Sequence, residues 1–120
     1  MNNKKLGTEF ERKVCRILSN DNWWVHFISP DNRGAQPFDI IAVKNGLALA
    51  ADCKTSASRW FSINRLEDNQ IMAFEKWIAC GNLEPKIIVG YKGQIILVGY
   101  KDLKEKGKVD LEELDGFFVH

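Results

Sequence analysis

The sequence predicts an α/β protein in which a mixed β-sheet lies between helices, and three observations lead to this prediction. Stretches with apolar residues at helical spacing alternate with runs of β-branched and aromatic residues. Two pairs of these runs are joined by Asn45-Gly46 and Lys92-Gly93, dipeptides that suit two-residue hairpin turns. The runs beside the first turn are apolar on both faces, and such a sheet needs a covering layer on each side.

The expected elements follow the order helix, three strands, helix and two strands. Apolar residues at helical spacing predict a first helix over residues 7–20, and a second helix runs from residue 65 or 66 to residue 80, before Gly81. The five strands are expected over residues 23–28, 38–44, 47–54, 86–91 and 94–99. Residues 29–34 read as a loop, residues 102–106 as a short last helix, and the apolar residues 117–119 as a tail that docks on the fold.

Length and composition indicate a single domain over residues 1–120. No apolar run approaches the roughly 18 residues that cross a bilayer, so we expect no membrane association. Three cysteines are an odd number without a C-x-x-C pair, which favours a reducing cytoplasm over a disulfide framework or a zinc site. Residues 1–65 hold ten Lys or Arg against six Asp or Glu, and residues 66–120 hold seven against ten. The basic half suits a polyanion, although ordinary scatter of solvated charges explains it equally well.

The turn at Asn45-Gly46 fixes which residues of the first hairpin face each other. Pairing Lys44 with Leu47 makes the numbers of opposed residues sum to 91, so Asp39 faces Asp52. Opposed residues share a face, with Cβ atoms roughly 4.5–5.5 Å apart. Two carboxylates at that separation repel each other, and a divalent cation between them would remove the conflict.

Lys54 lies two residues beyond Asp52 and therefore points to the same face. Two acids and an amine at the end of a hairpin suit hydrolysis of a phosphodiester, because Mg²⁺ binds through one or two carboxylates and activates water. The lysine would orient that water or offset charge on the phosphate. The alternative is a strand-end ion pair between Asp52 and Lys54, with Asp39 capping a turn.

The small residues Ala48 and Ala50 share the face of the two acids and leave space for a closely packed helix. We expect the first helix there, with Glu9 at the margin of its apolar stripe and able to reach the cation. The alternative for Glu9 is a surface pair with Lys13.

These residues resemble the PD-(D/E)xK nuclease superfamily. The resemblance covers about residues 5–100 and rests on Gly7-Thr8-Glu9-Phe10-Glu11, Pro37-Phe38-Asp39 and Asp52-Cys53-Lys54, in that order. It implies a restriction-endonuclease-like core. Within the superfamily the sequence is similar to the RecU-type Holliday junction resolvases of bacteria and phages and to the archaeal Hjc-type resolvases. Residues 61–63 leading into residues 69–72 add to the RecU-type similarity, but the long stalk of that type has no room between residues 29 and 37.

The resemblance implies a role for each matching residue. Asp39, Asp52 and the Cys53 backbone carbonyl would bind the metal, Lys54 would be the catalytic lysine, and Glu9 would be the helix acid. It also implies Mg²⁺ or Mn²⁺ as cofactor, a homodimer as working unit, branched DNA as substrate and a bacterial or phage source.

Polar residues near the acids are the candidate DNA contacts, since hydroxyl and guanidinium groups suit phosphates. They are Lys4, Lys5, Arg33, Gln36, Thr55, Ser56 and Arg59, and the resemblance adds Gln70. The alternative is that these loops are merely solvated. Trp60 lies beside Arg59, where stacking on a splayed base is conceivable, whereas Trp23, Trp24 and Trp77 are more typical of a core or an interface.

Three hypotheses for function remain at this stage. The first is a metal-dependent endonuclease that resolves four-way DNA junctions. The second is a restriction-type or nicking endonuclease on the same core, and the third is a DNA-binding module whose nuclease site is idle.

Overall fold

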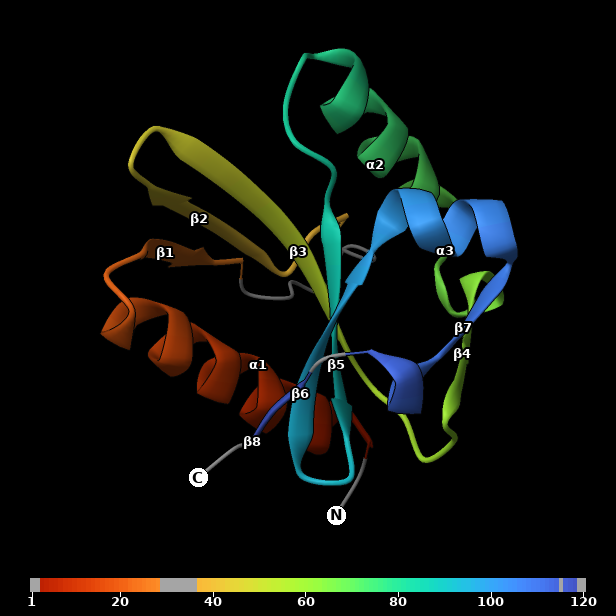
Figure 1. Ribbon diagram of the computed structural model, residues 1–120. Helices are drawn as coiled ribbons and strands as arrows, with labels where there is room; N and C mark the ends of the chain where they lie inside the picture. The colour runs from red at the N-terminus through yellow and green to blue at the C-terminus, as the bar shows by residue number, and fades with distance from the viewer. Residues whose placement is uncertain (1–2, 29–36, 115, 119–120) are drawn as a thin grey trace.

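The central element of the fold is a six-stranded mixed sheet. The computed structural model describes residues 3–28, 37–114 and 116–118 (Figure 1). The strand order is β1-β2-β3-β5-β6-β8, in which only β3 and β5 pair in parallel. The strands are β1 (Trp24–Phe27), β2 (Ile40–Lys44), β3 (Leu47–Thr55), β5 (Lys86–Tyr91), β6 (Gln94–Gly99) and β8 (Gly116–Phe118). The predicted α/β class and mixed sheet are confirmed.

Helices cover both faces of this sheet. Helix α1 (Asn3–Asn20) lies on one face, where Val14 is buried with Ile40, Ala51 and their neighbours. Helices α2 (Asp68–Ala79) and α3 (Tyr100–Lys106) lie on the other face, where Phe74 and Leu103 are fully buried. The sheet is therefore the middle layer of three, as its two apolar faces predict.

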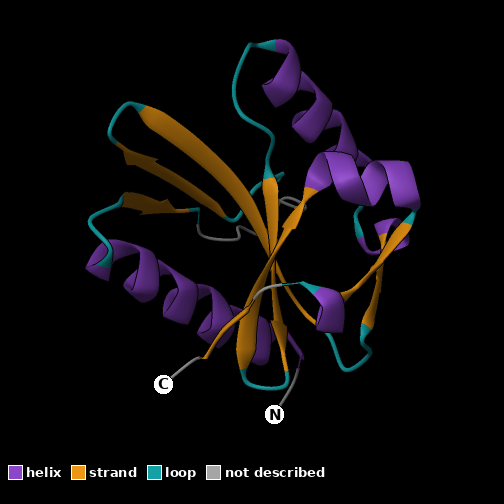
Figure 2. Ribbon diagram, in the orientation of Figure 1, coloured by secondary structure: helices purple, strands orange, loops and turns teal. Residues whose placement is uncertain are grey.

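A second, two-stranded sheet lies on the α2 side of the core (Figure 2). Its strands β4 (Trp60–Ser62) and β7 (Lys108–Asp110) are antiparallel, and the 3-10 turns η1 (Ile63–Arg65) and η2 (Leu111–Glu113) follow them. Phe61 and Val109 anchor this ribbon because both side chains are buried in the core. This ribbon was not predicted from the sequence.

The predicted boundaries hold best where turns define them. Strands β5 and β6 span the predicted residues, and the tail docks as β8 by pairing with β6. Helix α2 begins at Asp68, because Ile63–Arg65 form a separate turn whose Asn64 amide donates to the Ser62 hydroxyl, 3.1 Å away. In the described part of the chain, no helix is long and apolar enough to cross a membrane.

The first hairpin has the predicted register. Asn45 and Gly46 both have positive φ, as a type I′ turn requires, and the pairing runs from Lys44 opposite Leu47 to Ile40 opposite Ala51. Strand β2 begins at Ile40 rather than at Phe38. Phe38 therefore leaves the face of Ile40 and stacks on Phe74 of α2, with ring centroids 5.2 Å apart. The chain therefore leaves the regular geometry of β2 at Asp39.

Candidate active site

Asp39 lies where the chain enters the central sheet, between β1 and β3. Its carbonyl accepts a hydrogen bond from the Ile28 amide at 2.8 Å, and its amide donates to the Ala51 carbonyl at 2.9 Å. Its carboxylate accepts a hydrogen bond from the Cys53 amide at 2.7 Å. Two of these bonds fix the amide and the side chain of Asp39 against β3, and the third fixes its carbonyl beside the end of β1.

Asp52 is the most buried acid of the site, with 1% of its surface exposed. Its Oδ1 accepts a hydrogen bond from Gln70 Nε2 of α2 at 2.7 Å. Its Oδ2 lies 3.3 Å from Lys54 Nζ but accepts no hydrogen bond with adequate geometry. Asp52 is therefore held from α2 on one side, and its other oxygen is buried beside the Lys54 ammonium without a protein hydrogen bond.

The acidic side chains of the site lie close together and are partly removed from water, which changes their pKa values. Burial, with the nearby negative charge of Asp39, raises the pKa of Asp52 from its ordinary 3.8 to about 8, although Lys54 opposes the shift. Lys54 keeps 21% of its side chain exposed, so its ammonium is accessible from solvent. In the absence of a cation this shift favours the protonated form of Asp52 below about pH 8.

The backbone of Cys53 also points into the site. The N–H and C=O of one residue leave a strand on the same side, and the Cys53 amide points at Asp39. Its carbonyl therefore points towards Asp39 as well, where β2 has ended and offers no partner strand. The use of the Cys53 carbonyl as a metal ligand stays a prediction.

The helix acid nearest the site is Glu11, not the predicted Glu9. Burial raises the pKa of Glu11 to about 7; the charge of Asp39 adds to this shift and Lys54 opposes it, so Glu11 is within electrostatic reach of both residues. Glu9 is exposed and lines a separate hollow with Arg12, Lys13 and others. The helical pattern does not distinguish Glu11 from Glu9, because the two lie equally far around the helix from Phe10.

The expected position of the first helix also needs correction. Ala50 faces α2, where it packs in the cluster of Phe74, whereas α1 packs on Ala51 and Cys53 of the opposite face. Asp52 shares the face of Ala50, so α2 and not α1 is the helix that covers it. Glu11 approaches the site from the other side of the sheet.

The donor set fits a hard divalent cation. A buried carboxylate oxygen without a hydrogen bond, a second carboxylate and a backbone carbonyl are the oxygen ligands that Mg²⁺ accepts alongside water. Over the described residues, no three Asp, Glu, His or Cys side chains form a ready cluster for an ion. Two carboxylates are enough for a cation that keeps several waters.

The predicted DNA contacts are not equally available. Arg33 and Gln36 lie outside the described residues, as do the side chains of Lys4 and Lys5. Gln70 is 4% exposed and bonds both Asp52 and the Glu67 amide, so it positions the acid instead of facing a ligand.

The loop after Lys54 supplies the remaining predicted contacts. Thr55 is exposed and opens onto solvent. The Ser56 hydroxyl is engaged within the loop, where it donates to the Ser58 carbonyl at 2.7 Å. Arg59 forms a two-point ion pair with Asp110, which occupies much of its guanidinium.

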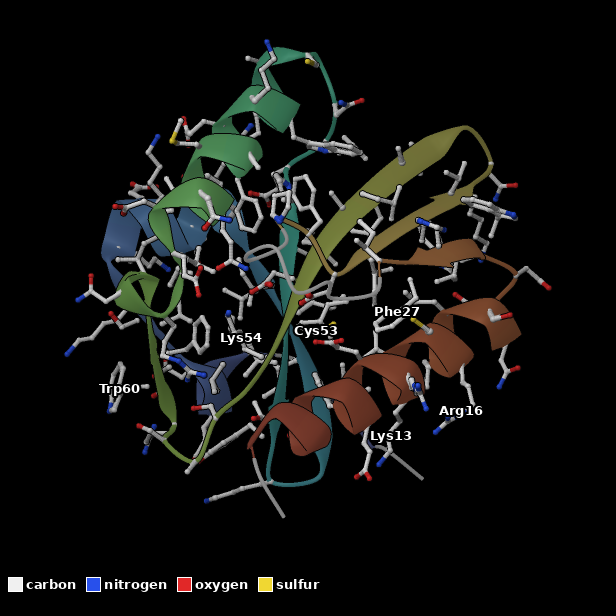
Figure 3. All side chains as sticks on the ribbon, turned by 180° about the vertical axis from the view of Figure 1, so that it is seen from behind. Lys13, Arg16, Phe27, Cys53, Lys54 and Trp60 are labelled. Atoms are coloured by element: carbon white, nitrogen blue, oxygen red, sulfur yellow. The ribbon has the colours of Figure 1, made fainter. Side chains whose placement is uncertain are left out.

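A basic surface that the sequence analysis did not single out lies on α1. Arg12, Lys13 and Arg16 line a hollow of about 670 Å³ together with Thr55. In the view of Figure 3, Lys54 lies between α1, which carries Lys13 and Arg16, and the ribbon that carries Trp60. Basic side chains therefore lie on the α1 side of the candidate site.

Known proteins share both the sequence pattern and the fold. The chain is 28% identical over 104 residues to the crossover junction endodeoxyribonuclease Hjc of Methanocaldococcus jannaschii, covering 87% of this chain and 73% of that protein. It is 25% identical over 91 residues to the crossover junction endodeoxyribonuclease Hje of Sulfolobus acidocaldarius, covering 75% of this chain and 63% of that protein.

The solved structure of Archaeoglobus fulgidus Hjc, a Holliday junction resolvase from an archaeal hyperthermophile, has the same fold. It matches with a TM-score of 0.70 and 17% identity, over 94% of this chain and 96% of that one. These relatives are archaeal, so they do not support the bacterial or phage source expected from the RecU-type similarity. The family described as archaeal Holliday junction resolvase (Hjc) matches residues 2–115, and the chain belongs to this family.

Proposed function

We propose that this protein is an Mg²⁺- or Mn²⁺-dependent endonuclease that resolves four-way DNA junctions, with its active site at Asp39, Asp52 and Lys54. One observation carries the assignment of the site: the buried Asp52 presents an oxygen without a hydrogen bond beside a second carboxylate and a lysine. A purely structural acid would be satisfied at every oxygen, because an unsatisfied buried acceptor destabilises a fold. Membership of the family supports the choice of substrate.

Asp39, Asp52 and the Cys53 carbonyl would hold the divalent cation. When bound, that ion polarises a phosphate oxygen and lowers the pKa of a water molecule. Gln70 keeps Asp52 in place through its 2.7 Å hydrogen bond, so the carboxylate cannot rotate away.

Lys54 supplies a positive charge that is present whether or not the cation is bound. Its ammonium lies 3.3 Å from Asp52 Oδ2 and is accessible to solvent, so it can contact a phosphate oxygen or the attacking water. Glu11 brings a third carboxyl close to Asp39 and Lys54 from the opposite side of the sheet. We assign Glu11, and not Glu9, as the helix acid of the reaction.

DNA would lie across the site against the basic surface of α1. Arg12, Lys13 and Arg16 would contact phosphates there together with Thr55, and the loop after Thr55 would add further contacts. Side chains of Lys4, Lys5, Arg33 and Gln36 remain proposed contacts from the sequence alone.

A homodimer is the working unit in this proposal. Resolution requires two cuts at symmetric positions of a junction, and the described part of each chain provides one Asp39–Asp52–Lys54 site. Two copies related by a two-fold axis would present two sites to a junction of matching symmetry. We place the reaction in the cytoplasm, because cysteines 15, 53 and 80 are all free thiols.

The test compares the wild type with Asp52→Asn on a four-way junction and a blunt duplex of equal arm length. We expect Mg²⁺-dependent, paired nicks in the junction, no cutting of the duplex, and a loss of at least about 10³-fold in the variant with DNA binding retained. Equal cutting of duplex would favour a restriction-type or nicking enzyme. Cleavage that survives the substitution, or binding without cleavage by the wild type, would contradict the assigned site.

A further inference from the structure

Trp60 is an exposed aromatic residue that the proposed chemistry does not use. Half of its surface, 50%, is open to solvent, although a tryptophan gains several kcal/mol of stabilisation from burial in a core. It lies in the first position of β4, six residues after Lys54. Because six residues span at most about 20 Å, Trp60 is within a few nucleotides of the scissile bond on any strand bound at the site.

The position of Trp60 is fixed by its neighbours. Phe61, the next residue, is fully buried and anchors β4 in the core. The Trp60 amide donates to the Ser58 hydroxyl at 3.1 Å, and the carbonyl of Arg59 accepts a hydrogen bond from the Leu111 amide at 2.7 Å. The indole therefore projects from a held backbone, which lowers the entropy that a ligand must overcome to stack on it.

Two cations accompany the ring. The Lys108 ammonium lies 5.0 Å from the centroid of Trp60, and the Arg59 guanidinium lies 5.7 Å from it. Arg59 is held there by its ion pair with Asp110, whereas the described acids form no ion pair with Lys108. With both cations in place half of the surface of Trp60 is still exposed, which leaves part of the residue accessible to a planar group.

We propose that Trp60 is a stacking platform for one unpaired nucleobase of branched or single-stranded DNA, and that Lys108 and Arg59 contact the phosphates beside that base. The inference rests on the proposed function, since it needs DNA at the site of Asp52 and Lys54. A base stacks on an exposed aromatic ring whatever its identity, and the flanking cations bind the backbone. In a junction, bases at the branch point are the ones that can leave their stacks.

Trp24 provides a contrast within the same chain. It is 65% exposed, on β1 at the edge of the large sheet, and it stacks on His26 with ring centroids 6.3 Å apart. No cation is found over its ring among the described residues. Trp24→Ala is therefore the matched control for removal of an exposed indole.

The experiment measures binding in EDTA, so that no cleavage occurs, to a blunt duplex and to the same duplex with a single-stranded tail. In the tailed probe, 2-aminopurine replaces one unpaired base. We expect Trp60→Ala to weaken binding of the tailed duplex by about 5- to 100-fold and that of the blunt duplex by less than about twofold. Trp60→Phe should restore most of the affinity, and Trp24→Ala should match the wild type. The wild type should quench 2-aminopurine, and Trp60→Ala should not.

Unchanged affinity in Trp60→Ala, or an equal loss on both probes, would overturn the platform. Absence of 2-aminopurine quenching by the wild type would overturn it too, without relying on the fold of any variant. If the wild type shows no such effect of Trp60 but still nicks junctions, and this activity requires Asp52, only the proposal for Trp60 is contradicted. If the wild type neither binds nor cuts DNA, the proposed function fails with it.

Discussion

The choice between two neighbouring glutamates decides how α1 contributes to the site. Glu9 and Glu11 each lie about 100° from the core residue Phe10, on opposite sides of it. The rotation of α1 about its own axis decides which of them faces Asp39. That rotation depends on packing against the sheet, which cannot be read from the helical periodicity of the sequence. The structure turns Glu11 towards Asp39 and Lys54, and Glu9 towards solvent.

This orientation predicts unequal effects of two identical substitutions. Glu11→Gln should lower single-turnover cleavage of a four-way junction by about 10²-fold or more, because it removes a carboxyl beside the reacting phosphate. Glu9→Gln should stay within about twofold of the wild type, since its side chain is exposed and outside the acidic group. The reverse order of effects would show that α1 is rotated differently from the arrangement described above.

At the scale of elements, the hairpin turns could be predicted from the sequence, but the face of the sheet that each helix covers could not. Asn45-Gly46 fixed the register through to Ala51, and the same logic located β5 and β6. The face for each helix was ambiguous because Ala50 and Ala51 are both small, so either face of β3 accepts a helix. The strands of the small ribbon have three residues each, too few for an alternating pattern to be distinguished from a loop.

Helix α1 rests on β5 at a glycine, and this contact predicts a coupled loss of stability and activity. A Cβ added at Gly90 would lie 2.7 Å from Phe10 Cε1, so the Phe10 ring would have to shift. Gly90→Ala should cost about 1–3 kcal/mol in the free energy of unfolding. It should also slow junction cleavage, because Glu11 follows Phe10 directly. Urea unfolding and single-turnover cleavage measure the two effects.

The control for Gly90→Ala is Gly99→Ala, whose Cβ would meet no residue of α1. Its nearest contact would be the Glu84 carboxylate, which accepts a hydrogen bond from the Lys101 amide and pairs with Lys86. It should leave cleavage unchanged. Adding Phe10→Leu to Gly90→Ala should recover part of the activity, because a smaller side chain relieves the overlap. Additive losses in the double variant would mean that Phe10 and Gly90 do not act through a shared contact.

At the scale of the whole molecule, the candidate site reduces stability in the absence of a cation. Asp52 and Glu11 both have raised pKa values, about 8 and about 7, because folding removes their carboxyls from water and brings them near Asp39. Each group therefore binds protons more tightly in the folded state than in the unfolded state. A fold selected for stability alone would place neutral groups there.

The last prediction follows from the sign of these shifts. Between about pH 4 and pH 8 the folded state carries more protons than the unfolded state, so the free energy of unfolding should fall as pH rises through this range. Asp52→Asn should remove most of the slope and should exceed the wild type in stability at pH 8 by on the order of 2–4 kcal/mol, with the difference vanishing towards pH 4. Urea unfolding in EDTA across this range measures it. Millimolar Mg²⁺ should stabilise the wild type at pH 8 and leave Asp52→Asn nearly unchanged, because the cation needs the ionised carboxylate. A flat pH profile in the wild type, or equal stabilisation of both proteins by Mg²⁺, would show that Asp52 is not the group that couples folding to the cation.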